Sequence, residues 1–362
     1  MQTEAETMNS SYFRFHKPTF EIMPKTIVLL IITFLSFACT PTSKEKKDIL
    51  LSHEVIKLPE TIIGNAYSIQ KVHHFLIVLD YSADSFFHLI DLKNKAYKGM
   101  YGNRGQAPND FIHPGKLHPL RNNQLCTFDS AKGEIKLLTI HAENETLDCS
   151  TYLSVKQNHA FEMIPVGEDV LLTNGAFEQS MFQLCSFQND ILSISDEYPY
   201  KDEKEHKLSN QLRAMAYQGI LSMNGQKKFA YATSNAHQIH FYQIKDNQLD
   251  KLTEIIESYA QYIPNGNTTG YSVLNDGNSP ECFTDLATTD NHVYALYSGR
   301  TFNEYKLSFR ESKSLFVYDW NGKLIKTYHL DIPIVCFCID EKEQKIYAIA
   351  NLPDPALVIF SL

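Results

Sequence analysis

Short runs of alternating apolar and polar residues recur along most of the chain. Six of them share one pattern, with a polar start, an alternating apolar body and often a polar end. They span residues 74–80, 123–129, 168–174, 227–233, 291–297 and 344–350. Such alternation is typical of β-strands with one covered face. After a short polar gap, each run is followed by a second strand-like run, so the pattern predicts six hairpins. The second runs are residues 86–92, 134–140, 181–187, 238–244, 314–318 and 356–362.

The spacing of the hairpins indicates the fold class. Successive first runs end 45 to 64 residues apart, and one unit per roughly 40–50 residues is typical of a four-stranded propeller blade. The sequence therefore predicts an all-β, six-bladed β-propeller. Residues 202–213 and 249–259 are candidate helices, expected to be local insertions.

The end of the chain supports a closed ring. Residues 334–340, 346–350 and 356–362 supply three strands of the last blade, and then the chain stops. The fourth strand is expected from residues 53–59, ahead of the first blade. Closing the ring in this way covers an exposed sheet edge. Deleting residues 53–60 should therefore destabilise the whole ring.

The first forty residues are predicted to be a targeting segment. An apolar run covers residues 27–38, too short for the ~20 residues of a membrane-spanning helix, and Lys25 precedes it. Cys39 and a polar stretch follow it. We expect a lipoprotein signal peptide over 1–38, a lipid on Cys39, a flexible tether over 39–52 and the propeller over 53–362. An ordinary secretory signal with a chance cysteine is the alternative. A start at Met23 would give the usual shape of such a signal.

Composition narrows the possible partners. Lys and Arg number 33 against 42 Asp and Glu, a net charge of −9, which argues against nucleic-acid binding because that needs a basic face. Aromatic residues reach 12%, in keeping with a strand-rich fold. Apart from Cys39, most cysteines lie in apolar strand-like runs and are expected to be buried thiols, with disulfides as the alternative. Cys336 and Cys338 should share one face of a strand, and a disulfide between them is not expected.

One loop carries a family resemblance. Residues 101–111, YGNRGQAPNDF, resemble the G-x-x-G-Q-G-P-x-E-F loop of the TolB-like six-bladed propeller lipoproteins of Bacteroidetes, with Ala107 in place of glycine and Asp110 in place of glutamate. Residues 297–300 and 318–348 are also similar to this family. The resemblance implies the propeller fold and a location in the cell envelope. It implies no particular activity, because most members have none assigned.

Seven residues are candidates for ligand binding. The loop after the first blade offers Arg104, Gln106 and Asp110, which either lock two blades together or face the mouth of the central channel and hold an anionic or sugar ligand. Asp285 on an inner strand and Arg300 at the end of a second strand either line the channel or are buried structural residues. The turn-rich insertion over residues 259–280 offers Tyr262 and Tyr271, which could stack on a sugar or a protein partner or belong to a merely tolerated insertion.

Catalytic motifs do not stand out in the sequence. There is no H-E-x-x-H, C-x-x-C, G-x-S-x-G or G-x-G-x-x-G pattern, so no metal, cofactor or catalytic residue is assigned. We expect a non-catalytic binding or scaffolding propeller for an envelope protein or a glycan, attached to the outer membrane through a lipidated Cys39. A periplasmic accessory protein of the TolB kind is a variant of this hypothesis. A metal-dependent propeller hydrolase or lyase with its site in the channel is the alternative. That alternative requires carboxylates or imidazoles from different blades to converge at one channel mouth.

Overall fold

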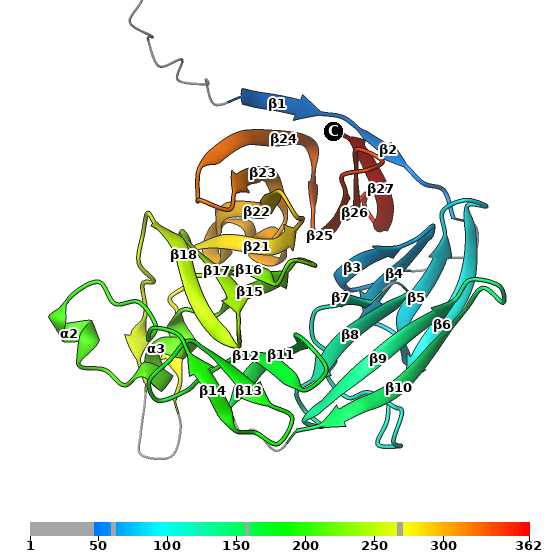
Figure 1. Cartoon of the computed structure of the whole chain (residues 1–362). Coiled ribbons are helices and arrows are strands. Elements are labelled where there is room, and N and C mark those ends of the chain that lie inside the picture. The colour runs from blue at the N-terminus through cyan, green and yellow to red at the C-terminus, as the bar shows by residue number, and fades with distance from the viewer. Residues whose placement is uncertain (1–46, 59–62, 122, 156–158, 266–270) are drawn as a thin grey trace, which may run out of the picture. The chain divides into compact units, whose positions relative to one another are not determined.

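The computed structural model describes residues 47–58, 63–121, 123–155, 159–265 and 271–362. Six of their sheets, each with an antiparallel core, are arranged in a ring and follow the sequence from blue to red in Figure 1. The expected all-β, six-bladed propeller is confirmed. The predicted signal peptide, Cys39 and the possible start at Met23 lie outside the described residues.

Each blade runs from an inner strand outward to an edge strand. Blade one contains β3 (Ala66–Val72), β4 (Phe75–Asp80), β5 (Ser85–Asp91) and β6 (Ala96–Asn103). Blade two contains β7 (His118–Arg121), β8 (Gln124–Asp129), β9 (Glu134–His141) and β10 (Thr146–Ser154). Blade three contains β11 (Ala160–Pro165), β12 (Val170–Gly175), β13 (Phe182–Ser186) and β14 (Ile191–Ile194).

The remaining blades follow the same order. Blade four contains β15 (Gly219–Met223), β16 (Lys228–Thr233), β17 (Gln238–Lys245) and β18 (Gln248–Ile256). Blade five contains β21 (Pro280–Thr288), β22 (His292–Thr301), β23 (Ser312–Asp319) and β24 (Leu324–Ile334). Blade six contains β25 (Cys336–Asp340), β26 (Lys345–Asn351) and β27 (Pro355–Ser361).

The hydrophobic core lies between the blades. The second strands β4 and β12 are buried at every residue, because neighbouring blades cover both faces of each sheet. Successive side chains of a strand point to opposite faces of its sheet, so neighbouring residues pack against different neighbouring blades. Cys336 and Cys338 pack toward blade one, whereas Phe337 between them packs toward blade five. These two cysteines therefore share one face, as predicted, and both are buried free thiols.

The N-terminal segment closes the ring with two strands. Strand β2 (His53–Val55) pairs antiparallel with β27 and completes blade six, as expected. Strand β1 (Lys47–Leu51) pairs parallel with β24 and becomes a fifth strand of blade five. The tether predicted over residues 39–52 is therefore wrong for residues 47–51. Residues 47–51 become a strand because the free edge of β24 offers them unpaired backbone groups. The sequence of this short segment does not indicate that such an edge lies beside it.

A carboxylate at the end of a second strand holds the start of its own blade. Asp80 accepts hydrogen bonds from the amides of Gly64 and Asn65, which lead into β3. Asp129 accepts from the amides of Ile112 and His113, which precede β7. The polar end of these two repeated runs thus ties strand two to the segment that leads into strand one.

The insertions leave the ring between its blades. Residues after blade three form α2 (Glu203–His206) and α3 (Asn210–Ala216), which overlap the candidate helical segment 202–213 and extend three residues beyond it. The other candidate helix, 249–259, is wrong because most of it is the edge strand β18, which pairs with β17. The insertion after blade four contains the short hairpin β19 (Ile263–Pro264) and β20 (Val273–Leu274). Between β22 and β23 lie α4 (Phe302–Tyr305) and η1 (Lys306–Ser308). None of the helices in the described residues has the length and apolarity needed to cross a membrane.

Candidate functional site

The loop between blades one and two is built into the structure of both blades. The Arg104 guanidinium lies 4.1 Å from the Phe86 ring centre and donates to the carbonyls of Tyr81 and Ala83. The Asp110 carboxylate accepts from the Ala107 amide within the loop. Gln106 is exposed. Arg104 and Asp110 therefore make the contacts that hold the loop in place.

Two glycines allow the loop to turn, for different reasons. Gly102 has a φ of +72°, and a Cβ there would also collide with the Phe87 ring. Gly105 does not lie in the left-handed region. A side chain at Gly105 would instead meet the Asp110 carboxylate. The loop thus requires glycine at 102, whereas a side chain at 105 would displace the Asp110 carboxylate.

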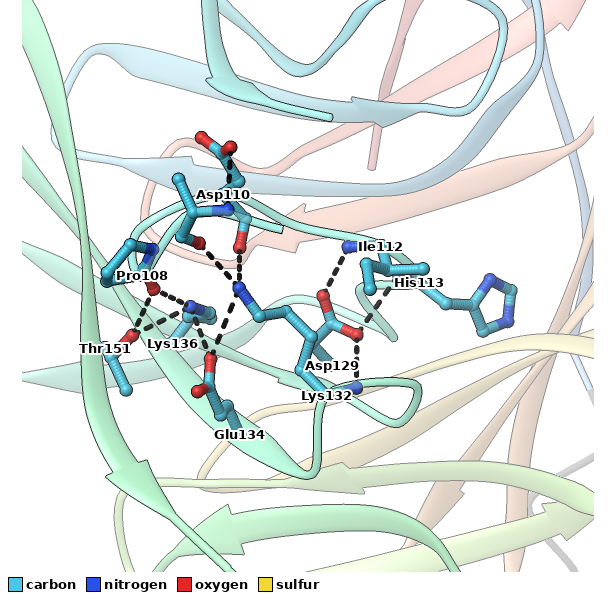
Figure 2. A network of polar contacts seen from close by, with 10 residues as sticks. Pro108, Asp110, Ile112, His113, Asp129, Lys132, Glu134, Lys136 and Thr151 are labelled. Carbon is cyan, nitrogen blue, oxygen red and sulfur yellow. Dashed lines mark hydrogen bonds and ion pairs between the residues drawn. The ribbon is translucent and has the colours of Figure 1, made fainter. Parts of the chain in front are cut away.

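Two lysines of blade two hold the loop from below (Figure 2). Lys132 donates to the carbonyls of Ala107 and Asp110, at 2.7 and 3.1 Å. The buried Lys136 donates to the Pro108 carbonyl at 2.6 Å. Thr151 on the edge strand β10 donates to that same carbonyl. The loop therefore follows blade two toward its outer edge, away from the ring axis.

A buried ion pair crosses the centre of the ring. Lys116, just before the inner strand of blade two, forms an ion pair with Asp285 on the inner strand of blade five. Asp285 also accepts from the amide of Phe337 in blade six, at 2.9 Å. Burial alone would lower the pKa of Lys116, but Asp285 outweighs this effect and the pKa is raised. Three blades are therefore joined through one carboxylate.

Further charged groups surround this pair. His118 of blade two pairs with Glu162 of blade three. Tyr67 on β3 is half exposed, and its pKa is raised by desolvation, with Glu162 adding to the rise. Lys116 pairs with Asp285, and Arg310 pairs with Glu281 on the same inner strand; charges of this group also act on the Tyr67 hydroxyl. We call the set the axial cluster; it comprises Tyr67, Lys116, His118, Glu162, Glu281, Asp285 and Arg310.

The axial cluster continues into an aromatic loop, residues 300–311 of blade five. Arg310 pairs with Glu281, at 2.9 Å between Nε and Oε1. Burial raises the pKa of Glu281, although Arg310 opposes the rise. Along the loop, cations lie over rings, as Arg300 does over Tyr305 at 4.8 Å. Leu307 at the tip is 92% exposed. The axial cluster and this loop together form a surface that we call the axial face.

The two candidate tyrosines of the insertion after blade four, Tyr262 and Tyr271, contact different parts of the structure. The Tyr262 hydroxyl donates to the buried Glu205 of α2 at 2.7 Å, and desolvation and Glu205 raise the pKa of Tyr262. Glu205 also accepts from Tyr217 and from the Lys201 amide. Tyr262 thus docks one insertion on another. Tyr271 is exposed and lines a shallow cavity beside blade three.

The structure brings only part of the predicted set together. Asp285 lies in the axial cluster and Arg300 lies in the adjoining aromatic loop, whereas the other five candidates lie elsewhere. The other members of the cluster were not predicted from the sequence. A usable signal was present, because Glu162, Glu281 and Asp285 interrupt inner strands that are otherwise mostly apolar. Carboxylates and an imidazole from different blades do converge here. Each carboxylate, however, is already paired with a lysine, an arginine or a histidine. Within the described ranges, no three His, Cys, Asp or Glu residues are grouped so as to hold a metal ion.

The fold and its axial face define a six-bladed β-propeller with a charged, largely self-paired channel mouth. The chain belongs to the TolB-like 6-blade propeller-like family, which matches residues 44–342. The structure is similar to a candidate exported protein from Bacteroides fragilis, with a TM-score of 0.50, 13% identity, and coverage of 87% of this chain and 99% of that one. It is similar to the β-propeller domain of Cps50 (Swd1) from Myceliophteria thermophila, with a TM-score of 0.50, 11% identity, and coverage of 86% and 99%. No curated protein matches the sequence.

Proposed function

We propose that this chain is an exported, non-catalytic lipoprotein whose propeller binds a protein partner at the axial face. One observation carries the proposal: charged groups from blades two, three and five adjoin an exposed loop rich in aromatic residues and arginine. Aromatic residues and arginine are enriched in protein interfaces and dominate their binding energy. The candidate export of the similar Bacteroides fragilis protein supports an envelope location.

The proposed anchor limits where that partner lies. Lys47, the first residue of β1, follows Cys39 by eight residues. A fully extended chain of that length spans at most about 29 Å. The propeller therefore stays close to the outer membrane, and its partner must reach the membrane surface. Replacing Cys39 with serine should release the protein from the membrane fraction. Retention of Cys39→Ser in that fraction would contradict the lipid anchor.

The partner site is tested by photo-crosslinking in the native host. A photoreactive residue replaces Leu307 in one strain and Leu50, which is 72% exposed on β1, in a control strain. We expect an adduct of one defined mass at position 307, no such adduct at 50, and loss of the adduct when Arg310→Ala is added. Equal adducts at both positions, or none at 307, would contradict the proposal. An adduct with a glycan would assign the face to the alternative ligand. A divalent ion bound stoichiometrically at Asp285 and Glu162 would instead favour the hydrolase or lyase.

A further inference from the structure

A second cavity, remote from the axial face, lies between blades three and four. The segment after β14 and the outer strands β17 and β18 line it, and its volume is about 520 Å³. That size is within the usual range for small-molecule sites. We call it the inter-blade pocket.

The charges of the inter-blade pocket are already paired. Lys251 Nζ lies 2.8 Å from Glu254 Oε2 and 3.2 Å from Asp196 Oδ2. Glu197, the remaining carboxylate, pairs with the buried Arg213. The His240 side chain lowers the pKa of Glu254 to about 2, with Lys251 adding to the effect. An ion entering the pocket would therefore have to break an existing pair, which disfavours charged ligands.

In the described residues, both ring nitrogens of His240 and the Tyr242 hydroxyl lack a hydrogen-bond partner. His240 Nδ1 lies 3.2 Å from Glu254 Oε2, and burial lowers the pKa of His240. A neutral imidazole, which burial favours, donates one hydrogen bond and accepts another. In the part of the chain that the structure describes, neither Nε2 nor the Tyr242 hydroxyl has a hydrogen-bond partner. Buried polar atoms are normally satisfied, so both can take a hydrogen bond from a ligand, and Ser195 lies near the Tyr242 hydroxyl. Because both atoms are covered, a ligand hydroxyl would reach them through a bridging water or a small shift of Lys251.

Tyrosine rings form the rim of the same pocket. Tyr200 is held by His206, whose ring lies 4.2 Å away at 21°. Tyr259 is 38% exposed on the opposite flank, after β18. Rigid rings of this kind offer an apolar face to a ligand with a polar edge. We propose that the inter-blade pocket binds a neutral saccharide, which contacts the tyrosine rim and hydrogen-bonds to the paired carboxylates and to the unsatisfied atoms beneath them. This proposal does not depend on whether the axial face binds a partner.

Saturation-transfer NMR on the full chain tests the proposal. The probes are the methyl glycosides of mannose, galactose, glucose and N-acetylglucosamine, each at millimolar concentration. We expect at least one to bind, and Tyr259→Ala to weaken it by about three- to tenfold. Tyr152→Ala is the matched control, because Tyr152 is 37% exposed but lies on blade two. This control and the axial variant Leu307→Glu should bind the sugar like the unchanged protein.

Several results would overturn the inference. They are the absence of binding for every probe, an equal loss in Tyr259→Ala and Tyr152→Ala, or tighter binding of glucosamine or glucuronate than of neutral sugars. Glu254→Gln adds a second test, since it removes one of the two carboxylate partners of Lys251 while keeping the side-chain shape, and it should weaken sugar binding. If Glu254→Gln fails to fold, the tyrosine pair still decides the question. Loss of sugar binding in Leu307→Glu would move the site to the axial face.

Discussion

Replacing Lys116 with methionine should weaken the whole ring. Methionine keeps most of the aliphatic length of lysine but removes the ammonium that pairs with Asp285. The side chains of both partners are almost completely buried, so water cannot take over the lost interaction. Asp285 would retain two backbone donors, the amides of Phe337 at 2.9 Å and Leu286 at 2.8 Å.

The magnitude follows from this geometry. Leaving one charge of a buried pair without its partner costs about 3–5 kcal/mol. The two remaining amide donors stabilise the carboxylate, so we expect the lower end, about 3 kcal/mol. For a domain of this size that corresponds to a fall in Tm of about 5–10 °C. The double variant Lys116→Met/Asp285→Leu removes both charges and should be less destabilised than the sum of the single variants.

Thermal and chemical unfolding of the four proteins in this cycle would measure the effect. We expect a coupling free energy of about 2 kcal/mol between Lys116 and Asp285. Destabilisation below about 1 kcal/mol in each single variant, with additive effects in the double variant, would refute the reasoning. The pair would then behave as a solvated one, and blades two, five and six would not be linked through Asp285.

Three other predictions concern closure, acid stability and the loop between blades one and two. In urea unfolding, Leu51→Ala should lower the free energy of unfolding by about 2–3 kcal/mol, because Leu51 is buried against blade five. The exposed Leu50 on the same strand is the control, and Leu50→Ala should change the free energy of unfolding by less than about 0.5 kcal/mol. Burial would raise the pKa of Asp80, but hydrogen bonds from His88 and backbone amides outweigh burial and lower the pKa. The ionised Asp80 therefore stabilises the folded state fully above the unfolded pKa of about 3.9, and this contribution is lost as the pH falls below that value. In melts at graded pH, Asp80→Asn should lose less stability than the unchanged protein between pH ~5 and ~2. Arg104→Ala should lower the free energy of unfolding by about 1 kcal/mol, since it loses the contact with Phe86 and two hydrogen bonds to carbonyl groups. It should leave crosslinking at position 307 unchanged. A loss of the adduct without a loss of stability would restore Arg104 as a binding residue.

The charged residues of the channel show where sequence reasoning reached its limit. Asp285 was assigned to an inner strand and Arg300 to the end of a second strand, and both placements are confirmed. Their partners could not be predicted, because Lys116 is separated from Asp285 by 169 positions. The spacing of residues within one blade carries no information about which side chain of another blade lies across the ring.

The sequence by itself determined the repeat. Alternating apolar residues specify strands with covered faces, polar gaps specify the turns, and six copies with an incomplete last one specify a ring closed by the N-terminal segment. These are local properties, because they depend on residues two to ten positions apart. The tertiary structure alone decided which charges meet at the axis, why β1 is added to blade five, and how Asp196 after blade three meets Lys251 of blade four. Those outcomes depend on the twist and radius at which six sheets close, and no single blade contains that information.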